Sequence, residues 1–426
     1  MLARHFLRPA LYTVAFFVLA AITANAQIPA AETLNSIPPL PPAGDAALGY
    51  SRTNDLIWLV STAIGLVFPA LILFTGTSAK IRDLSQRIGK LWLPTLAIYL
   101  AIYLALAWIV NLPLNWFDNF YVEHAYGLSN QSLGRWLRNS AIMIVLGLIL
   151  FTVAFGLLYR FINWSPKRWW LWGAVTFVPV TLLLSIIQPI YIEPLFNRFE
   201  PVSDAAIESE IRALADRAGI GDADILEMNA SADTESINAA VRGFLGTKRI
   251  VFYDTMMEKL DRDAVLFVMG HEIGHYVLNH RIQRILIGSV LVLAALWTLF
   301  RLSDKLITSF ERRFGFSKLH DIASVPLFLV YIQLLSLVFL PVYAAFVRHT
   351  EHEADRFALE MTQDNVACAK VMIAGIEERL SSPRPGLMYR VWQASHPTIG
   401  DRYDFCVAYR PWETGADSKY TEHFSL

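Results

Sequence analysis

Long apolar stretches separated by charged connections dominate the chain. They occupy residues 56–74, 91–110, 141–158, 169–190, 285–300 and 325–346. Most are near the length that a helix needs to cross the roughly 30 Å of a bilayer's hydrocarbon core. Any one of them could be a buried helix of a soluble protein, but such a series predicts a bundle of membrane helices, over residues 55–190 and again over 284–347.

The N-terminal residues fit two interpretations. Arg4 and Arg8 precede an apolar core at 11–21, and Ala24-Asn25-Ala26 has the small residues of a cleavage site. Residues 1–26 are therefore predicted to be either a secretory signal peptide or a first membrane helix. Residues 27–54, rich in proline and alanine, are predicted to be an exposed linker.

The polar pattern changes near residue 200. Charges at helical spacing over 203–218 predict an amphipathic helix, and short runs at 224–228 and 249–253 predict strands, with an irregular or extended connection between them. We predict a soluble domain over 191–283 and a second soluble part over 348–426, with helices at 353–363 and 365–380.

Composition agrees with a membrane protein. Of 426 residues, 55% are hydrophobic and 17% are charged, which is atypical of a soluble enzyme. The formal net charge of -1 and the absence of basic runs with interleaved aromatics give no sign of a nucleic-acid partner. Cys368 and Cys406 could form a disulfide in an oxidising compartment, although we favour two free buried thiols.

Candidate chemistry centres on His271-Glu-Ile-Gly-His275. On a helix, which Asp261 or Asp263 can cap, both imidazoles lie on one face and can bind one metal ion, while Glu272 can take a proton from water. This is the HExxH pattern of zinc hydrolases. The alternative is a buried helix with two unrelated histidines.

A third ligand should come from elsewhere, because catalytic Zn²⁺ takes three protein ligands and keeps one position open. We assign Glu351 to the metal. Asp355, four residues later on the same helical face, is expected to accept the free N–H of a ligand histidine. Glu353 should point away, and His349 and His352 are possible substitutes.

HExxH followed by ExxxD among several membrane spans resembles the type 1 CAAX prenyl protease family of integral-membrane zinc metalloproteases. Similar segments are Phe-Tyr-Val-Glu-His-Ala-Tyr-Gly at 120–127, Glu-Pro-Leu-Phe-Asn at 193–197, Asn-Ala-Ala at 238–240, residues 248–254, and Ser-His-Pro at 395–397 with Arg402. The resemblance implies that seven membrane helices form a ring around a large cavity, which the zinc domain closes. Cleavage after residue 26 would leave six.

The resemblance also supplies further site residues. It implies a substrate-binding role for Asn238 and places His396 and Arg402 beside the metal. Chemically, His396 could donate to an oxyanion, and Arg402 could hold Asp355 or a substrate carboxylate. The predicted fold is therefore mainly α, a polytopic membrane bundle enclosing a cavity, with a zincin-like catalytic domain containing a few short strands.

The expected function is that of a zinc endopeptidase acting on peptide or protein substrates in contact with membrane lipid. Three ligands beside a free carboxylate favour an enzyme over a membrane chaperone or scaffold with structural zinc. Only the resemblance implies a prenylated substrate, and a general quality-control protease for membrane or exported proteins is equally compatible.

The distribution of Lys and Arg predicts orientation. Three short connections are rich in them: Lys80, Arg82, Arg87 and Lys90; Arg160, Lys167 and Arg168; and Arg301, Lys305, Arg312, Arg313 and Lys318. Such loops stay cytoplasmic, which places the zinc domain outside a bacterial inner membrane. Arg281, Arg284 and Arg348 count against this, and the resemblance implies cytosolic substrates.

Overall fold

The computed structural model describes residues 37–243 and 248–424, so the predicted signal peptide or first membrane helix lies outside the described residues. Within the described ranges, six helical segments are long and apolar enough to cross a membrane. Their main helices are α2 (Asp45–Phe74), α4 (Trp92–Trp116), α6 (Leu133–Trp164), α7 (Trp169–Ile187), α11 (His280–Phe314) and α12 (Val325–Thr362). Each contains all or nearly all of the apolar stretch that predicts it.

These helices extend beyond their apolar stretches. α2 begins at Asp45, inside the range predicted as a linker. α11 continues through the basic segment that follows Arg301, and α12 continues past residue 347 as far as Thr362. Neither extension contains Gly or Pro, and Glu, Arg, Leu and Ala are good helix formers. The hydrogen-bonded backbone therefore carries on where the hydrophobicity stops.

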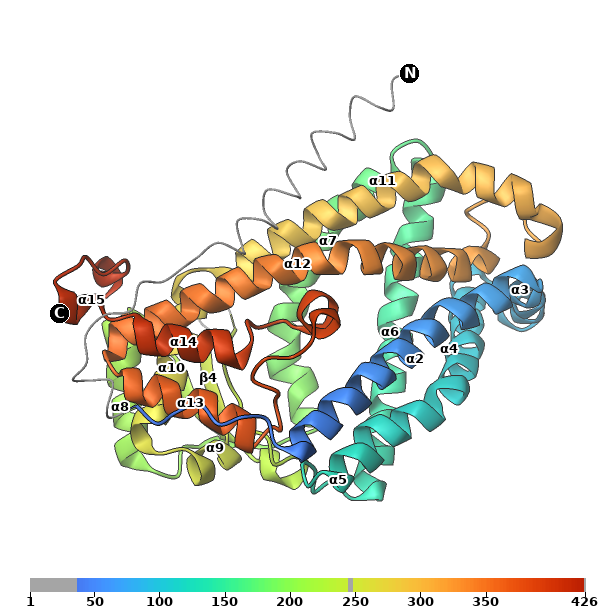
Figure 1. Ribbon diagram of the computed structural model, residues 1–426. Coiled ribbons are helices and arrows are strands. Elements are labelled where there is room, and N and C mark those ends of the chain that lie inside the picture. The colour runs from blue at the N-terminus through green and yellow to red at the C-terminus, as the bar shows by residue number, and fades with distance from the viewer. Residues whose placement is uncertain (1–36, 244–247, 425–426) are drawn as a thin grey trace.

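The six membrane helices form a ring. Contacts join α2 to α4, α4 to α6, α6 to α7, α7 to α11, α11 to α12, and α12 back to α2. In Figure 1, α11 and α12 run together along one side, and α2, α4 and α6 descend on the other. Only 6% of the most apolar window of α6, and the same share in α7, is buried, whereas helices packed around a filled core would bury a whole face. Most side chains in these windows of α6 and α7 are therefore not covered by neighbouring helices.

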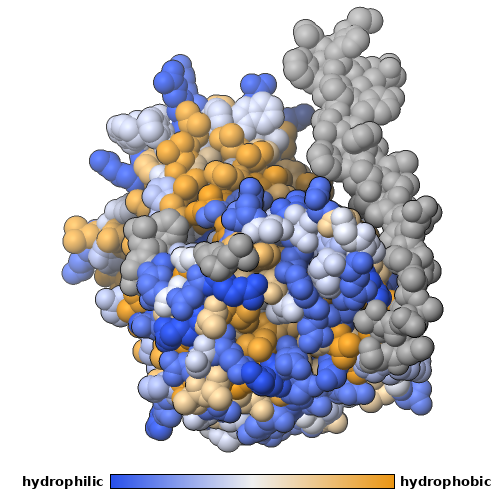
Figure 2. Space-filling model, turned by 90° about the vertical axis from the view of Figure 1, so that its left-hand side faces the viewer, coloured by the Kyte–Doolittle hydropathy of each residue, from blue (hydrophilic) through white to orange (hydrophobic). Residues whose placement is uncertain are grey.

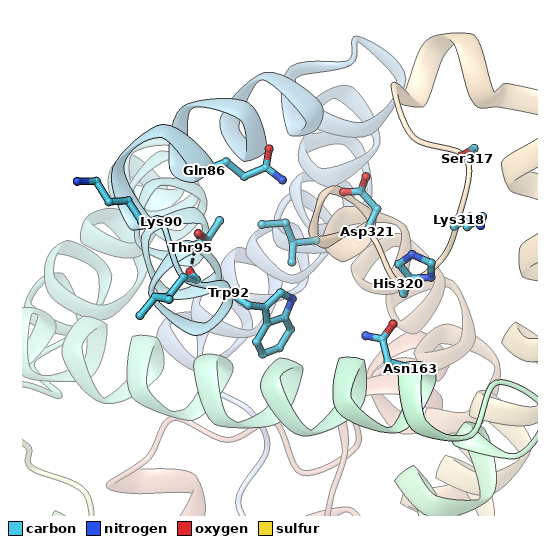
Figure 3. A pocket seen from close by; sticks show the side chains of 11 residues that line it. Gln86, Lys90, Trp92, Thr95, Asn163, Ser317, Lys318, His320 and Asp321 are labelled. Carbon is cyan, nitrogen blue, oxygen red and sulfur yellow. Dashed lines mark hydrogen bonds between the residues drawn. The ribbon is translucent and has the colours of Figure 1, made fainter.

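A packed aromatic cluster closes the end of the ring far from the soluble domain. It includes Tyr99, Tyr159 and Phe328 and lies under α3 (Thr77–Gly89). The hydroxyl of Ser78 donates to the carbonyl of Ala323 at 2.6 Å. Beside this cluster a cavity of about 510 Å³ opens between α3, α4 and the loop before α12, lined by residues that include Lys90, Trp92 and His320 (Figure 3).

The soluble domain is built on a four-stranded sheet of order β1-β2-β4-β3. β2 (Asp224–Met228) and β4 (Arg249–Tyr253) have the bounds that the sequence predicts, and they pair in parallel. β1 (Phe199–Pro201) pairs antiparallel with β2 at one edge, and β3 (Ala239–Arg242) pairs antiparallel with β4 at the other. The three-residue β1 was not predicted, because a strand that short has almost no pattern of its own. Figure 2 shows that the outer face of this domain is largely hydrophilic.

Helices cover the sheet and lead to the C-terminus. They are α8 (Ala205–Arg217), α9 (Asp254–Lys259), α10 (Arg262–Val277), α13 (Asn365–Glu377), α14 (Ile399–Ala408) and α15 (Pro411–Thr414). The short helical segments are α5 (Glu123–Ala125), η2 (Phe117–Val122), η3 (Gln188–Ile192), η4 (Glu193–Leu195), η5 (Ala230–Ala232), η7 (Ile322–Ser324), η8 (Tyr389–Gln393) and η9 (Thr421–His423). Ile211 of α8 and Met269 of α10 pack with Phe252 in the core of the domain.

Hydrogen bonds and ion pairs help to fix the soluble domain to the rest of the described chain. Arg135, at the start of α6, pairs with Asp233 and donates to the side chain of Asn197 at 3.1 Å. The segment before α2 crosses the C-terminal part, where the Tyr403 hydroxyl donates to the Pro38 carbonyl at 2.8 Å. Residues 37–44 therefore lie on the same side of the ring as the soluble domain.

The structure joins Cys368 of α13 to Cys406 of α14 in a disulfide, so our preference for free thiols was wrong. Both residues are fully buried, and their Cα atoms are 5.6 Å apart, within the range that a disulfide requires. The pairing depends on how α13 packs against α14, which the spacing of two cysteines does not reveal.

We expect replacement of both cysteines by serine to lower the free energy of unfolding by about 2–4 kcal/mol, because the bridge restricts the unfolded chain. Mass spectrometry of alkylated, unreduced protein should find neither thiol labelled. Two labelled cysteines in protein purified under oxidising conditions would contradict the bridge.

Candidate metal centre

The HExxH segment lies on α10, as its pattern predicts. The carboxylate of Asp261 accepts a hydrogen bond from the amide of Ala264 at 3.0 Å, which caps the helix start. One turn apart on the same face, His271 and His275 bring their Nε2 atoms to within 3.1 Å. Both rings are therefore placed to share one ion.

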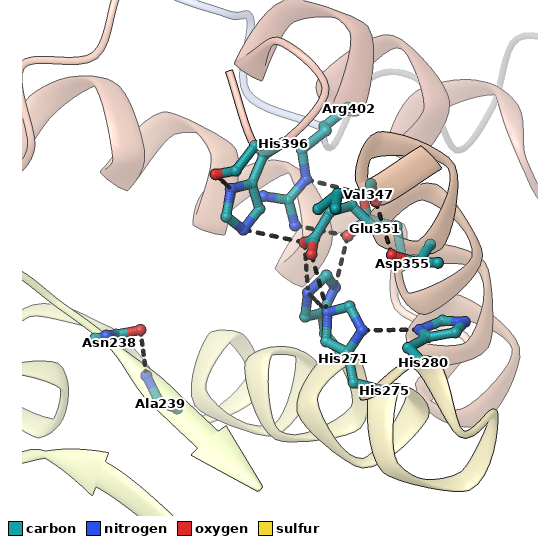
Figure 4. Close-up of polar contacts among 12 residues, drawn as sticks. Asn238, Ala239, His271, His275, His280, Val347, Glu351, Asp355, His396 and Arg402 are labelled. Atoms are coloured by element: carbon teal, nitrogen blue, oxygen red, sulfur yellow. Dashed lines mark hydrogen bonds and ion pairs between the residues drawn. The ribbon is translucent and has the colours of Figure 1, made fainter. Parts of the chain in front are cut away.

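Close packing of α12 against α10 brings the predicted third ligand to the histidines. Gly270 and Gly274 lie on the contact face of α10, where an added Cβ would meet Ala358 at 3.4 Å and Phe357 at 3.0 Å. Glu351 thereby reaches the histidines, with Oε2 at 3.4 Å from Nε2 of His271 and Oε1 at 3.3 Å from Nε2 of His275. One potential ligand atom from each of the three residues lies within 4.8 Å of the others, as Figure 4 shows.

A second layer of side chains surrounds His271. Its Nδ1 lies 2.9 Å from Oδ1 of Asp355, one helical turn after Glu351. Arg402 of α14 donates to both oxygens of Asp355, at 2.8 and 2.6 Å. The sequence analysis gave two possible partners for Arg402, Asp355 or a substrate carboxylate, and in the structure Arg402 binds Asp355.

Two residues that the sequence analysis missed come from α11. His280 places its Nδ1 2.8 Å from Nδ1 of His275, and Arg284 donates to Oε1 of Glu351 at 2.7 Å. No periodic pattern could have identified them, because a chain reversal between α10 and α11 sets their position. The only available signal was a third histidine five residues after the second.

The remaining predicted residues lie around this cluster. Glu272 is partly buried, and its side chain makes no hydrogen bond or ion pair with any residue that the structure describes. His396 is half exposed, with its Nε2 3.0 Å from Oε2 of Glu351. Asn238 immediately precedes the edge strand β3, across from the cluster in Figure 4.

Alternative ligands are excluded by their contacts. Glu353 bonds to Lys419, Tyr420 and Arg356, so it points away from the cluster as expected. The ring of His352 packs on Phe405, with centroids 4.3 Å apart, and His349 is exposed. Neither histidine belongs to the cluster.

The donor set suits a divalent metal ion. Within the described residues, the buried Oε2 of Glu351 makes no hydrogen bond of its own, and it faces Nε2 of His271 at 3.4 Å and of His396 at 3.0 Å, an arrangement that a shared cation would satisfy. Burial lowers the pKa of His275 to about 4, which keeps its imidazole neutral and its lone pair available. Burial also raises the pKa of Glu272 to about 7. The cluster therefore combines three ligands with a poised proton acceptor.

A ring of membrane helices carrying this cluster at one end defines an integral-membrane metalloprotease. Residues 201–407 match the model of peptidase family M48, and residues 45–198 match that of the CAAX prenyl protease N-terminal region, described as five membrane helices. The chain belongs to peptidase family M48, in the group that includes the CAAX prenyl proteases.

Individual relatives agree with this assignment. The chain is 32% identical to the uncharacterized metalloprotease YhfN of Bacillus subtilis, over 83% of each chain. It is 29% identical to the CAAX prenyl protease 1 homolog of Dictyostelium discoideum, over 84% of this chain and 83% of that protein. In structure it resembles crystalline Ste24p of S. mikatae, with a TM-score of 0.70 at 22% identity, covering 84% of this chain and 87% of the other.

Asp355→Asn tests the second layer. The Asn side chain would no longer neutralise Arg402 or hold His271 through a charged acceptor, so metal affinity should fall about 10–100-fold. Competition with a chromogenic chelator measures this directly. An unchanged dissociation constant would show that the Asp355 contact does not support the ligand.

Proposed function

We propose that this protein is a zinc-dependent endopeptidase. The observation that carries the proposal is the convergence of His271, His275 and Glu351 beside the unpaired carboxylate of Glu272. Two imidazoles and one carboxylate are a common ligand set of catalytic zinc. When bound, the ion would supply Lewis acidity for the attack of water on a peptide carbonyl.

The protein's own groups would handle the protons and the developing charge. Glu272 accepts a proton from the attacking water and passes it to the leaving amine. His396, on the exposed side of the cluster, donates a hydrogen bond to the carbonyl oxygen as that oxygen becomes negative. Asp355 and Arg402 keep His271 oriented throughout.

The edge strand β3 offers a place for the substrate backbone. One edge of β3 pairs with β4, and no described strand pairs with the other. An extended peptide can add to such an edge through main-chain hydrogen bonds. Asn238, at the start of β3, would then bind the peptide where it passes the cluster.

The competing function is a membrane chaperone or scaffold with structural zinc, which would have four protein ligands. His396 is the candidate for a fourth ligand, because its Nε2 lies 3.0 Å from Oε2 of Glu351. Its side chain is 55% exposed, unlike the three buried or nearly buried ligands. This exposure favours a mobile catalytic donor over a closed structural site.

Several features support a catalytic domain that faces outward from a bacterial inner membrane. The basic connections gather at the opposite end, where Lys90 and Lys318 line one cavity. A disulfide near the cluster suits an oxidising compartment. The three arginines that counted against this orientation all contact other parts of the protein. Arg281 donates to the Gly243 carbonyl at 3.4 Å, Arg284 to Glu351 at 2.7 Å, and Arg348 to the Ala394 carbonyl at 3.0 Å.

The segment before α2 gives a further argument. Residues 37–44 lie on the side of the soluble domain, and the chain before them carries Arg4 and Arg8 ahead of one apolar core. If that core enters the membrane with its basic end inside, residues 37–44 emerge outside, whether or not cleavage follows. An outward-facing site would act on membrane or exported proteins, as in quality control. If the site faced the cytoplasm instead, its substrates would be prenylated cytosolic proteins.

Glu272→Gln tests the mechanism. Peptide hydrolysis should fall about 10²–10⁴-fold, because the amide cannot accept the proton, while zinc content stays at one ion per chain. Glu351→Ala should instead lower zinc occupancy. Glu258→Gln, an exposed change on α9, is the matched control. Turnover retained by purified Glu272→Gln protein would remove Glu272 from the reaction.

A reporter fused after Leu426 tests the orientation. Alkaline phosphatase folds only after export, so the fusion should be active, and a fluorescent reporter that matures only in the cytoplasm should be dark. The reverse pair of results would place the site inside and favour a prenylated cytosolic substrate.

A further inference from the structure

His280 is a buried histidine that has no role in the proposed reaction. It is 4% exposed and opens α11, directly after the HExxH helix. Its ring meets that of His275 with centroids 5.0 Å apart and planes inclined at 71°. Figure 4 shows His280 on the side of His275 that faces away from His396 and the open part of the site.

A specific backbone turn creates this contact. On a continuous helix, residues five apart differ by about 140° around the axis, so their side chains diverge. Here α10 ends at Val277, and Asn279 adopts the left-handed conformation with φ of 57°. Asn tolerates that conformation better than most residues. The chain thereby turns back and aims His280 at the preceding histidine.

The hydrogen bond determines where the protons lie. Both ligand histidines direct Nε2 toward Glu351, at 3.4 and 3.3 Å, so metal binding requires that the ring protons sit on Nδ1. For His271, the Nδ1 proton is donated to Asp355. For His275, the acceptor within reach is Nδ1 of His280, at 2.8 Å. That atom must then be unprotonated, and His280 carries its proton on Nε2.

We propose that His280 is a positioning residue that holds His275 in the tautomer and orientation needed to bind the metal. The two ligand histidines then have unequal supports, because His271 donates to a carboxylate and His275 donates to a neutral ring. A carboxylate beside both would add a negative charge to a cluster that already contains Glu351 and Asp355. The inference rests on the proposed metal site and extends it to a residue from a membrane helix.

Two substitutions separate positioning from simple filling of space. His280→Asn keeps an oxygen that can accept the Nδ1 proton of His275, whereas His280→Leu has similar bulk and no acceptor. We expect zinc affinity, measured by chelator competition, to fall about 10–100-fold in His280→Leu and to stay within about threefold in His280→Asn. The visible absorption of the cobalt-loaded protein should change in the first variant and be retained in the second.

His352→Leu is the matched control, because it removes a partly buried histidine adjacent to Glu351 that packs on Phe405 instead of a ligand. Its metal affinity should equal that of the unmodified protein. Melting curves without metal report whether each variant folds.

Wild-type affinity in a folded His280→Leu variant would overturn the proposal. Equal losses in His280→Leu and His280→Asn, with lowered melting temperatures, would also overturn it, by showing a packing role. Both results leave the three-ligand site intact. Failure of the unmodified protein to bind zinc or cobalt would instead refute the metal site itself.

Discussion

The close approach of α10 and α12 is the contact on which the rest of the site depends. Glycines at 270 and 274 alternate with the two cluster histidines along α10, so one face of the helix carries small residues and the next carries the candidate ligands. Phe357 and Ala358 of α12 occupy the small-residue face and are fully buried. This packing sets the distance at which Glu351 meets the histidines. A larger residue at position 274 would push apart the helices that assemble the cluster.

The membrane helices also supply the groups around the two histidines. α12 supplies Glu351 and, in the second layer, Asp355, and α11 supplies His280 and Arg284. Each ligand histidine therefore rests against a side chain from a different membrane helix. The soluble domain contributes the two histidines, and the membrane helices contribute most of the groups that fix their geometry. Neither part would form the cluster alone.

Sequence patterns predicted those features that depend on local periodicity. The strands at 224–228 and 249–253 agree with β2 and β4, and the apolar stretches identify the membrane helices. Spacing on a helix also predicted that His271 and His275 share one face and that Glu351 and Asp355 share another, because residues four apart lie on one side of a helix, and the structure brings His271, His275 and Glu351 together. The helix predicted at 353–363 is the end of α12. Its continuity with the membrane span, and the extension of α11, escaped prediction because charge marks a change of environment and not the end of a helix.

Features that depend on chain reversals or tertiary packing could not be predicted. His280 reaches His275 only because Asn279 turns the backbone, and Cys368 meets Cys406 only because α13 packs on α14. The three-residue β1 exists because β2 offers it hydrogen-bonding partners. Residue spacing carries no trace of any of these three.

The unbroken α12 also fixes a height above the bilayer. From Val325 to Glu351 the helix rises by 26 steps (351 minus 325), or about 39 Å at about 1.5 Å per residue. The hydrocarbon core of a bilayer is about 30 Å thick. A helix of this length that crossed it along the bilayer normal, starting at Val325, would hold the cluster within about 10 Å of the lipid tails. Because the helix is continuous, it would set the distance of the cluster from the membrane, and a polypeptide substrate would have to approach the membrane surface before it is cut.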